Sequence, residues 1–325
     1  MKKILLSLSG ILLILIIGTI IHLNKKNTTN KIIVSEVTHS VFYAPWYVAI
    51  ENGYFEEEGL DIEIMLTPGA DKVASAILSN DAHIGFSGPE ATIYVYNNSK
   101  EKLITFASLT KKDGQFIVGD CSLKDKFNLE MLKNKSILAG RNGGMPLMMF
   151  KYALYKSNIN ENDLTIDTSV EFAGLTGAFI SKQGDFVNLF EPNATALENK
   201  NIGCVLSSLG NLTENVPYTT FYAKEEYINN NKENIKKFNK ALNKGLKFVK
   251  ENNSTKIAQT IQNQFPDTNI NDLTKIIDRY KNIDAWYETT KINIDDYNKL
   301  QEIMIYGNSI KEKIDANILI TNEYN

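Results

Sequence analysis

Hydrophobic and polar residues alternate strictly over 60–64, which predicts a half-buried β-strand. Hydrophobic runs at 31–37 and 82–86 predict two further strands, both more deeply buried. Between them, residues at helical spacing predict an amphipathic helix: Val73, Ala74, Ile77 and Leu78. Strands that alternate with helices in this way indicate an α/β unit with a mostly parallel sheet.

A second α/β unit is predicted further along the chain. Its expected strands lie at 136–139, 165–170, 186–190 and 202–207. Segments 81–90 and 185–192 share one plan, in which an Asp precedes a buried strand and a Pro-bearing turn leads into a helix. Ligands of open parallel sheets bind beyond the carboxyl ends of the strands. We therefore expect one such strand end from each unit to face the other across a cleft.

The last hundred residues are predicted to be helical and to cover the first unit. One apolar stripe in this region consists of Ile235, Phe238, Leu242, Leu246 and Val249. A chain of 325 residues exceeds the usual size of a single core, which favours two lobes. We expect an N-terminal segment at 1–30, lobe 1 at 31–118 and 220–325, and lobe 2 at 119–219. The chain would pass between the lobes twice, near 115–120 and near 216–222, and these two crossings would form the hinge.

The N-terminal segment predicts export. Lys2 and Lys3 precede an uncharged run at 4–21, which is at the short edge of what spans a bilayer as a helix. The run lacks the small residues of a good cleavage site, so we expect an uncleaved membrane anchor, with a cleaved signal segment as the alternative. Lys2 and Lys3 stay inside the cell in both cases. The remainder would be extracytoplasmic, anchored to the cell membrane, or secreted or at the cell surface after cleavage.

Composition and motifs exclude several classes of function. A net charge of −3 does not indicate the basic surface that binding to nucleic acid requires. Cys121 and Cys204 are too few for a disulfide framework or a metal cluster, and whether they pair stays open. The Gly-rich turn at 140–146 could seat an anion or a polar oxygen at a helix start. It lacks the signatures of a P-loop and of a dinucleotide site, so we expect no nucleotide, cofactor or metal.

Candidate binding residues follow from their positions at strand ends and crossings. Aromatic rings there would stack on a flat ligand, and polar side chains would orient it. Core packing is the alternative for Tyr43 and Trp46, helix capping for Ser87 and Glu90, and an ordinary surface charge for Arg141. The candidates are Ser40, Phe42, Tyr43, Trp46, Ser87, Glu90, Arg141, Asn142, Gly143, Glu191, Tyr218 and Thr219.

The run at 42–55, with Glu58-Gly59-Leu60 after it, resembles a family signature. The family is that of the binding proteins of ABC importers for nitrate, taurine, alkanesulfonates and thiamine-pyrimidine precursors. The resemblance extends through 84–87, 140–146, 190–192 and 322–324. It implies a periplasmic-binding-protein type II fold, or Venus flytrap, that closes on a small solute. Such a protein would act as a monomer and deliver the solute to an ABC permease and its ATPase.

The ligand class is argued from charge. Glu90 and Glu191 at two strand ends disfavour a simple anion, because a buried like charge is costly. Aromatic residues with two carboxylates suit a thiamine-precursor-like pyrimidine or another amine-bearing heteroaromatic, with a taurine or alkanesulfonate ligand as the alternative. A surface adhesin or a signalling input with the same fold is a third class.

A pyrimidine-synthesising enzyme of the superfamily is a further alternative. That branch uses a lysine and a histidine beside the third strand and a cysteine cluster near the return crossing. This chain has Ser87 and Ala91 at the first place and Tyr218-Thr219-Thr220 at the second. We therefore expect no enzymatic activity.

Overall fold

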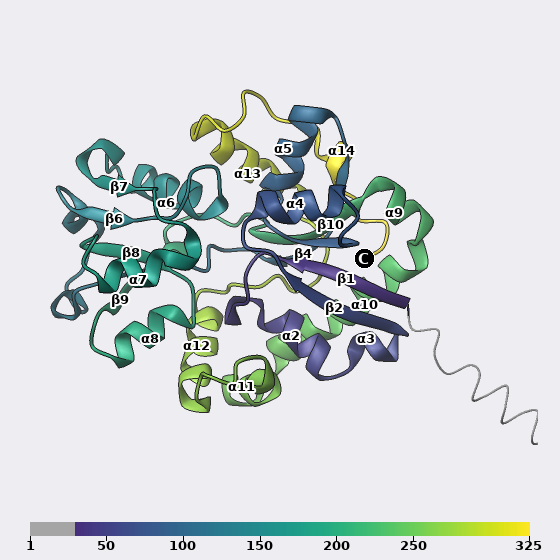
Figure 1. Cartoon of the computed structure of the whole chain (residues 1–325), viewed down its shortest axis with the longest axis horizontal. Coiled ribbons are helices and arrows are strands. Elements are labelled where there is room, and N and C mark those ends of the chain that lie inside the picture. The colour runs from purple at the N-terminus through teal and green to yellow at the C-terminus, as the bar shows by residue number, and fades with distance from the viewer. Residues whose placement is uncertain (1–29) are drawn as a thin grey trace, which may run out of the picture.

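The computed structural model describes residues 30–325, which form two α/β lobes side by side (Figure 1). The lobe 1 sheet has the order β2-β1-β3-β10-β4. Strand β1 runs parallel to β2 and β3, whereas β10 runs antiparallel to β3 and β4. The strands are β1 (Asn30–Glu36), β2 (Leu60–Leu66), β3 (Ile84–Ser87), β4 (Leu103–Thr110) and β10 (Thr219–Lys224).

The lobe 2 sheet repeats this topology with the order β7-β6-β8-β5-β9. Strand β6 is parallel to β7 and β8, and β5 is antiparallel to β8 and β9. These strands are β5 (Phe116–Gly119), β6 (Ser136–Leu138), β7 (Thr165–Asp167), β8 (Phe186–Leu189) and β9 (Cys204–Ser208). The fold class predicted from the sequence, two lobes of the periplasmic-binding-protein kind, is confirmed.

The crossings between the lobes differ from the sequence prediction. The predicted boundary at residue 118 places β5 in lobe 1, whereas its hydrogen bonds place it in the second sheet. The crossings are therefore residues 111–115 and 209–218. A four-residue apolar strand carries no signal that tells which sheet it joins, which explains the difference.

Helices cover both faces of the lobe 1 sheet. Pro45 lies in the first turn of α2, as its missing N–H group favours, and Gly53 takes a left-handed conformation after α2. The predicted apolar stripe of α10 is buried, and Gly245 allows α10 to approach Pro45, whose carbonyl oxygen would lie 2.2 Å from an added Cβ. The helices are α2 (Ala44–Glu51), α3 (Tyr54–Glu57), α4 (Ala70–Leu78), α5 (Glu90–Ser99), α9 (Glu225–Asn230), α10 (Lys232–Glu251) and α11 (Ser254–Ile261).

Two helices of the C-terminal part also contact lobe 2. Helix α12 (Ile270–Asn282) forms ion pairs with Glu198 of α8, and α13 (Ile294–Tyr306) packs on α6. The rings of Tyr155 and Tyr306 lie 4.4 Å apart at the second contact. The remaining helices are α6 (Met145–Lys156), α7 (Leu175–Ile180), α8 (Asn193–Asn199) and α14 (Ala316–Leu319).

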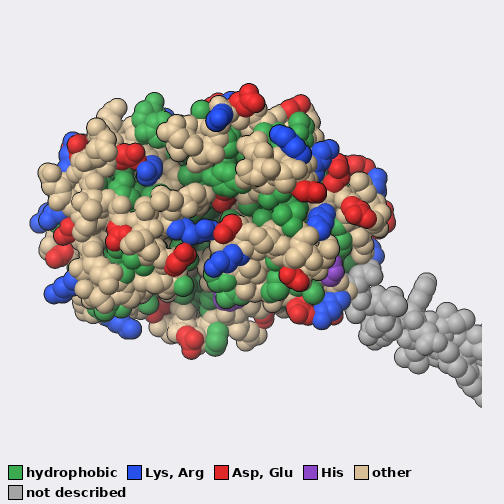
Figure 2. Space-filling view, turned by 45° about the horizontal axis from the view of Figure 1, so that its top comes forward, with side chains coloured by type: hydrophobic (Ala, Val, Ile, Leu, Met, Phe, Trp, Pro, Cys, Tyr) green, Lys and Arg blue, Asp and Glu red, His purple; other side chains and the backbone are tan. Residues whose placement is uncertain are grey.

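Cys121 and Cys204 form a disulfide with a Cα–Cα distance of 4.7 Å. It joins the 3₁₀ turn η2 (Cys121–Leu123) to the first residue of β9. Figure 2 shows acidic and basic side chains intermixed over the visible face. Within residues 30–325 no helix combines the length and apolar character needed to cross a membrane. The predicted anchor at 4–21 lies outside the described residues.

Candidate functional site

The turn after β1 meets the turn after β8 where the lobes touch. The Ser40 hydroxyl donates a 2.7 Å hydrogen bond to the backbone carbonyl of Glu191. The Glu191 N–H donates to the Tyr280 hydroxyl, which in turn donates to the carbonyl of Gly114 in the outgoing crossing. One chain of hydrogen bonds therefore links lobe 1, lobe 2 and a crossing.

Phe42 is the centre of an aromatic cluster whose rings come from both lobes and from the crossing 209–218. Its ring lies 5.6 Å from Phe190, 5.7 Å from Tyr218 and 5.2 Å from Tyr280. Gly114 lies against the Phe42 ring, since a Cβ added there would come within 2.6 Å of it. Rings at these separations pack favourably and offer flat apolar surfaces.

Glu90 is a buried carboxylate at the start of α5, and only 2% of its surface is exposed. The backbone N–H groups of Glu90 and of Met145, in lobe 2, lie close enough to this carboxylate to lower its pKa. Its Oε2 atom has no hydrogen-bond partner. Burial raises the pKa of Glu90 to about 7, and the two N–H groups only partly oppose that rise. The start of the lobe 2 helix, where the sequence predicts a seat for an anion or a polar oxygen, thus lies near a carboxyl group of lobe 1.

The Gly-rich turn of lobe 2 contacts lobe 1 at its surface. Arg141 forms an ion pair with Asp71, and the Tyr94 hydroxyl donates to the Gly143 carbonyl at 3.3 Å. Asn142 donates to Thr168 within lobe 2. A groove of about 430 Å³ lies between this turn and helices α4 and α5, with Glu90 among its lining residues.

Two buried amides have side-chain atoms without hydrogen-bond partners. Asn188 is fully buried, and neither its Nδ2 nor its Oδ1 atom is bonded. Gln115 donates to the Pro146 carbonyl at 3.2 Å, and its Oε1 atom has no partner. Asn188 lies opposite Ile117 in the sheet, so alternation places Gln115 and Asn188 on the same face, toward α6.

Asp113 and Tyr218 lie with these two amides in one buried cluster of polar side chains. Asp113 is fully buried and accepts hydrogen bonds from the Gln115 backbone N–H at 2.8 Å and side chain at 3.2 Å. Burial raises the pKa of Asp113 to about 7. Burial also raises the pKa of Tyr218, with the nearby Asp113 carboxylate adding to the shift. The Tyr218 hydroxyl makes no hydrogen bond of ordinary geometry.

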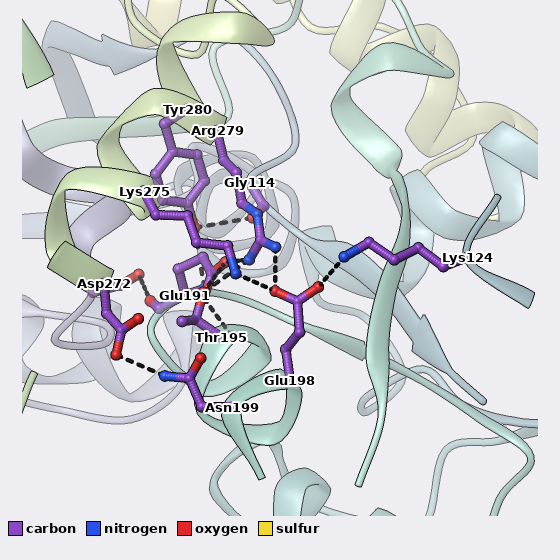
Figure 3. A network of polar contacts seen from close by, with 11 residues as sticks. Gly114, Lys124, Glu191, Thr195, Glu198, Asn199, Asp272, Lys275, Arg279 and Tyr280 are labelled. Atoms are coloured by element: carbon purple, nitrogen blue, oxygen red, sulfur yellow. Dashed lines mark hydrogen bonds and ion pairs between the residues drawn. The ribbon is translucent and has the colours of Figure 1, made fainter. Parts of the chain in front are cut away.

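Glu191 is held by lobe 1 in a polar network (Figure 3). Its carboxylate accepts hydrogen bonds from the Thr195 N–H at 2.8 Å, the Thr195 hydroxyl at 2.9 Å and Arg279 at 2.5 Å. Arg279 also binds Glu198 at 2.5 Å, and Glu198 accepts from Lys275 and Lys124. The Glu191 carboxylate is thus neutralised by α12, while its backbone faces Ser40.

The other candidate residues lie in the surroundings of this site. Tyr43 packs on Phe86 with the ring centroids 4.4 Å apart, and Thr219 lies close enough to its hydroxyl to act on its pKa. The Ser87 hydroxyl bonds the Tyr222 hydroxyl at 2.8 Å, and α5 has no side-chain cap, so the capping alternative does not hold for Ser87. Trp46 lies in the lobe 1 core, where its Nε1 donates to Glu36 at 3.0 Å.

The sequence prediction missed Asp113, Gln115 and Asn188. A weak signal existed for Asn188, because it is the single polar residue in the buried run 186–190. Asp113 and Gln115 flank Gly114 at the start of the crossing that the sequence predicts near 115–120, where they were expected to serve the hinge. Within the described part of the chain, no group of three or more His, Cys, Asp or Glu side chains is arranged to hold a metal ion.

Comparison with known proteins identifies the family of this chain. The sequence model of the family described as "NMT1/THI5 like" matches residues 41–255. A Bacillus subtilis protein named "Putative binding protein YtlA" is 38% identical over 301 residues, which cover 92% of this chain and 90% of the relative.

Solved structures share the fold at low sequence identity. The alkanesulfonate-binding protein SsuA of Xanthomonas axonopodis pv. citri, bound to MOPS, gives a TM-score of 0.71 at 13% identity, covering 90% of this chain and 98% of that one. The periplasmic nitrate-binding protein NrtA of Synechocystis PCC 6803 gives a TM-score of 0.70 at 14% identity, and the match covers 91% of this chain and 87% of that one. At these identities the likeness shows the fold alone.

Proposed function

We propose, from the premise that this chain belongs to the NMT1/THI5-like family, that it is the extracytoplasmic solute-binding component of an ABC importer. It would capture a small organic molecule between its lobes and deliver it to a permease and its ATPase. The relative named as a binding protein supports this proposal, as do neighbours of the same fold named for sulfonate and nitrate binding.

One observation carries the proposal for the site. Buried polar atoms without hydrogen-bond partners gather where the lobes meet, on Glu90, Gln115, Asn188 and Tyr218. A buried polar group without a partner costs about 1 to 3 kcal/mol, so native proteins keep few of them. A solute bound between the lobes would supply the missing hydrogen bonds, and Phe42 and Phe190 would cover its flat faces.

The arginines favour a heteroaromatic ligand over a sulfonate or nitrate. The chain has two arginines, Arg141 and Arg279, and both are engaged by carboxylates in ion pairs. An anion would therefore meet Glu90 without a free guanidinium to balance its charge. A ligand with amine donors on a flat ring fits the same surroundings, and a pyrimidine of the thiamine-precursor kind is one such ligand.

Capture would proceed by hinge closure about the crossings 111–115 and 209–218. Ser40 and Glu191, together with Glu90 and the Met145 N–H, are contacts between the lobes that such closure would make. The permease would then recognise the closed arrangement of the two lobes.

The disulfide supports an oxidising, extracytoplasmic location, because disulfides are rare in the cytosol. We propose that the hydrophobic run at 4–21 anchors the protein in the membrane and that it works as a monomer. No enzymatic activity is proposed, since Ser87 and Ala91 replace the catalytic lysine and histidine of the pyrimidine-synthesising branch.

Small-angle scattering tests capture directly. The protein is denatured to release copurified molecules, which are identified by mass spectrometry and added back to refolded protein. We expect the radius of gyration to fall when the ligand binds. Binding with no compaction would contradict hinge closure, and unchanged uptake of the labelled ligand by cells that lack this chain would contradict the role in import.

A further inference from the structure

Five carboxylates are buried in the described part of the chain, and three of them have a cationic partner. Glu36 has His39 at 3.2 Å, and Glu191 and Glu198 share Arg279. This is the usual arrangement, because a buried ionised carboxylate is stable only when it is paired. The remaining two are Glu90 and Asp113.

Neither Glu90 nor Asp113 has a Lys, Arg or His side chain within ion-pair distance among residues 30–325. The charged groups nearest Glu90 are Arg141 and Asp71, which bind each other at the surface. Tyrosines are the other titratable neighbours: Tyr43, Tyr94, Tyr218 and Tyr222.

Asp113 faces Tyr218 and Gln115, and the lysine two positions before it, Lys111, is bound to Asp284 at 2.7 Å. Glu90 and Asp113 both raise the pKa of Tyr218, so both carboxylates lie near that residue. The carboxylates without cations are therefore the two that lie at the proposed binding site.

We propose that the solute captured at this site is a small organic cation, whose charge provides the counter-ion that Glu90 and Asp113 lack. This inference rests on the proposed function and narrows its ligand class. The buried amides of Asn188 and Gln115 are an independent observation that points to a ligand at the same place.

The surrounding groups specify the shape and chemistry of the cation. Glu90 and Asp113 accept hydrogen bonds and would bind N–H donors, while Asn188 can both donate and accept. The rings of Phe42, Phe190 and Tyr218 favour a flat molecule. An amino-substituted heteroaromatic ring that is protonated when bound, or an aromatic amidine, meets all three conditions, whereas a sulfonate meets none.

Binding of a ligand that is already a cation in solution, such as an amidinium, should release protons. Without ligand, burial holds the pKa of each carboxyl at about 7, so each retains a proton in mildly acidic solution. The carboxyl must lose that proton to solvent before it can pair with the cation. Below about pH 7 the affinity should therefore fall about tenfold per pH unit for each carboxyl that must ionise.

Compounds of matched shape provide the first test. Thermal shift is measured at about pH 8 with 4-aminopyrimidine and benzamidine, against pyrimidine and benzamide as neutral controls and benzenesulfonate as the anionic control. We expect the two nitrogen bases to raise the melting temperature more than the controls do. Equal or larger shifts with the controls, or no shift with any base, would overturn the proposal.

Site variants then locate the charge. We expect Glu90→Gln and Asp113→Asn each to weaken benzamidine binding at least tenfold, to flatten its pH dependence and to reduce proton release in calorimetry. Glu90→Asp keeps the carboxyl group and should retain the pH dependence. This variant therefore shows whether the weaker binding of Glu90→Gln comes from the lost charge or from a disturbed fold. Glu130→Gln, which removes an exposed carboxylate of lobe 2, is the matched control. Unchanged affinity and pH profile in both site variants would overturn the proposal.

The copurified molecule separates this inference from the proposed function. A cation identified by mass spectrometry supports both. An anion, or a molecule without a basic nitrogen, that binds between the lobes and compacts the protein overturns the cation inference and leaves solute capture intact.

Discussion

Arg279 of lobe 1 binds Glu191 of lobe 2 at 2.5 Å, and the backbone of the same Glu191 accepts a hydrogen bond from Ser40. One residue of the second lobe is therefore held by two separate elements of the first. The Glu191 side chain belongs to the α12–α8 network, and its backbone belongs to the proposed binding site.

Replacing Arg279 with Gln should destabilise the protein strongly. It would leave Glu191 buried without its cation, and breaking a buried ion pair from one side costs roughly 3 to 5 kcal/mol. Urea unfolding monitored by tryptophan fluorescence measures the loss. Lys275→Gln is the matched control, because Lys275 is more exposed and its loss should cost about 1 kcal/mol or less. Similar losses in the two variants would contradict the central role of Arg279.

Replacing Ser40 with Ala should weaken binding without unfolding either lobe. The variant loses one hydrogen bond between the lobes, worth about 1 kcal/mol, or roughly a fivefold rise in dissociation constant. Calorimetry with the copurified ligand measures it. Thr260→Ala removes an exposed hydroxyl of α11 that bonds only its own helix, and should leave affinity unchanged. If both variants bind the ligand as the wild type does, the hydrogen bond between Ser40 and Glu191 does not contribute to binding.

Replacing Asn188 with Leu should separate stability from binding. Both polar atoms of this buried amide are unpaired, so an apolar side chain of similar size should leave the free energy of unfolding equal or higher. The same change should reduce ligand affinity at least tenfold if the amide contacts the solute. Denaturant unfolding and calorimetry on one preparation give both values. A variant that loses stability and keeps affinity would show that Asn188 is structural.

The ligand-free protein should become less stable as the pH rises from about 4 to 7. The pKa of Glu90 and of Asp113 is raised from 4.5 and 3.8 to about 7 in the folded state, so the folded state binds more protons than the unfolded state in this window. Urea midpoints across this window test the sign. Glu90→Gln and Asp113→Asn should each flatten the curve, and a wild-type midpoint that rises steadily would contradict the assignment.

Sequence patterns predicted the architecture well because burial imposes regular spacing. The alternation at 60–64, Pro45 at a helix start and the apolar stripe of α10 all appear as expected. Contacts between residues far apart in the chain could not be predicted from these local patterns. Trp46 and Phe42 lie four residues apart in one motif, yet Trp46 packs in the lobe 1 core and Phe42 at the lobe interface.

The ion pair of Glu191 could not be predicted from the sequence either. Its position at a strand end was foreseen, but its partner Arg279 is 88 residues away and comes from a helix expected only to cover lobe 1. Glu90 and Glu191 look alike in the sequence. Only the placement of cations separates the neutralised carboxylate from the one left without a counter-ion.

The disulfide makes a covalent ring of nearly the whole second lobe, since its two cysteines are 83 residues apart and enclose β6, β7, β8 and their helices. A single protease cut anywhere between residues 122 and 203 would therefore leave both fragments attached to each other. Such a nicked molecule would migrate as one band on a gel without reductant and as two bands with it.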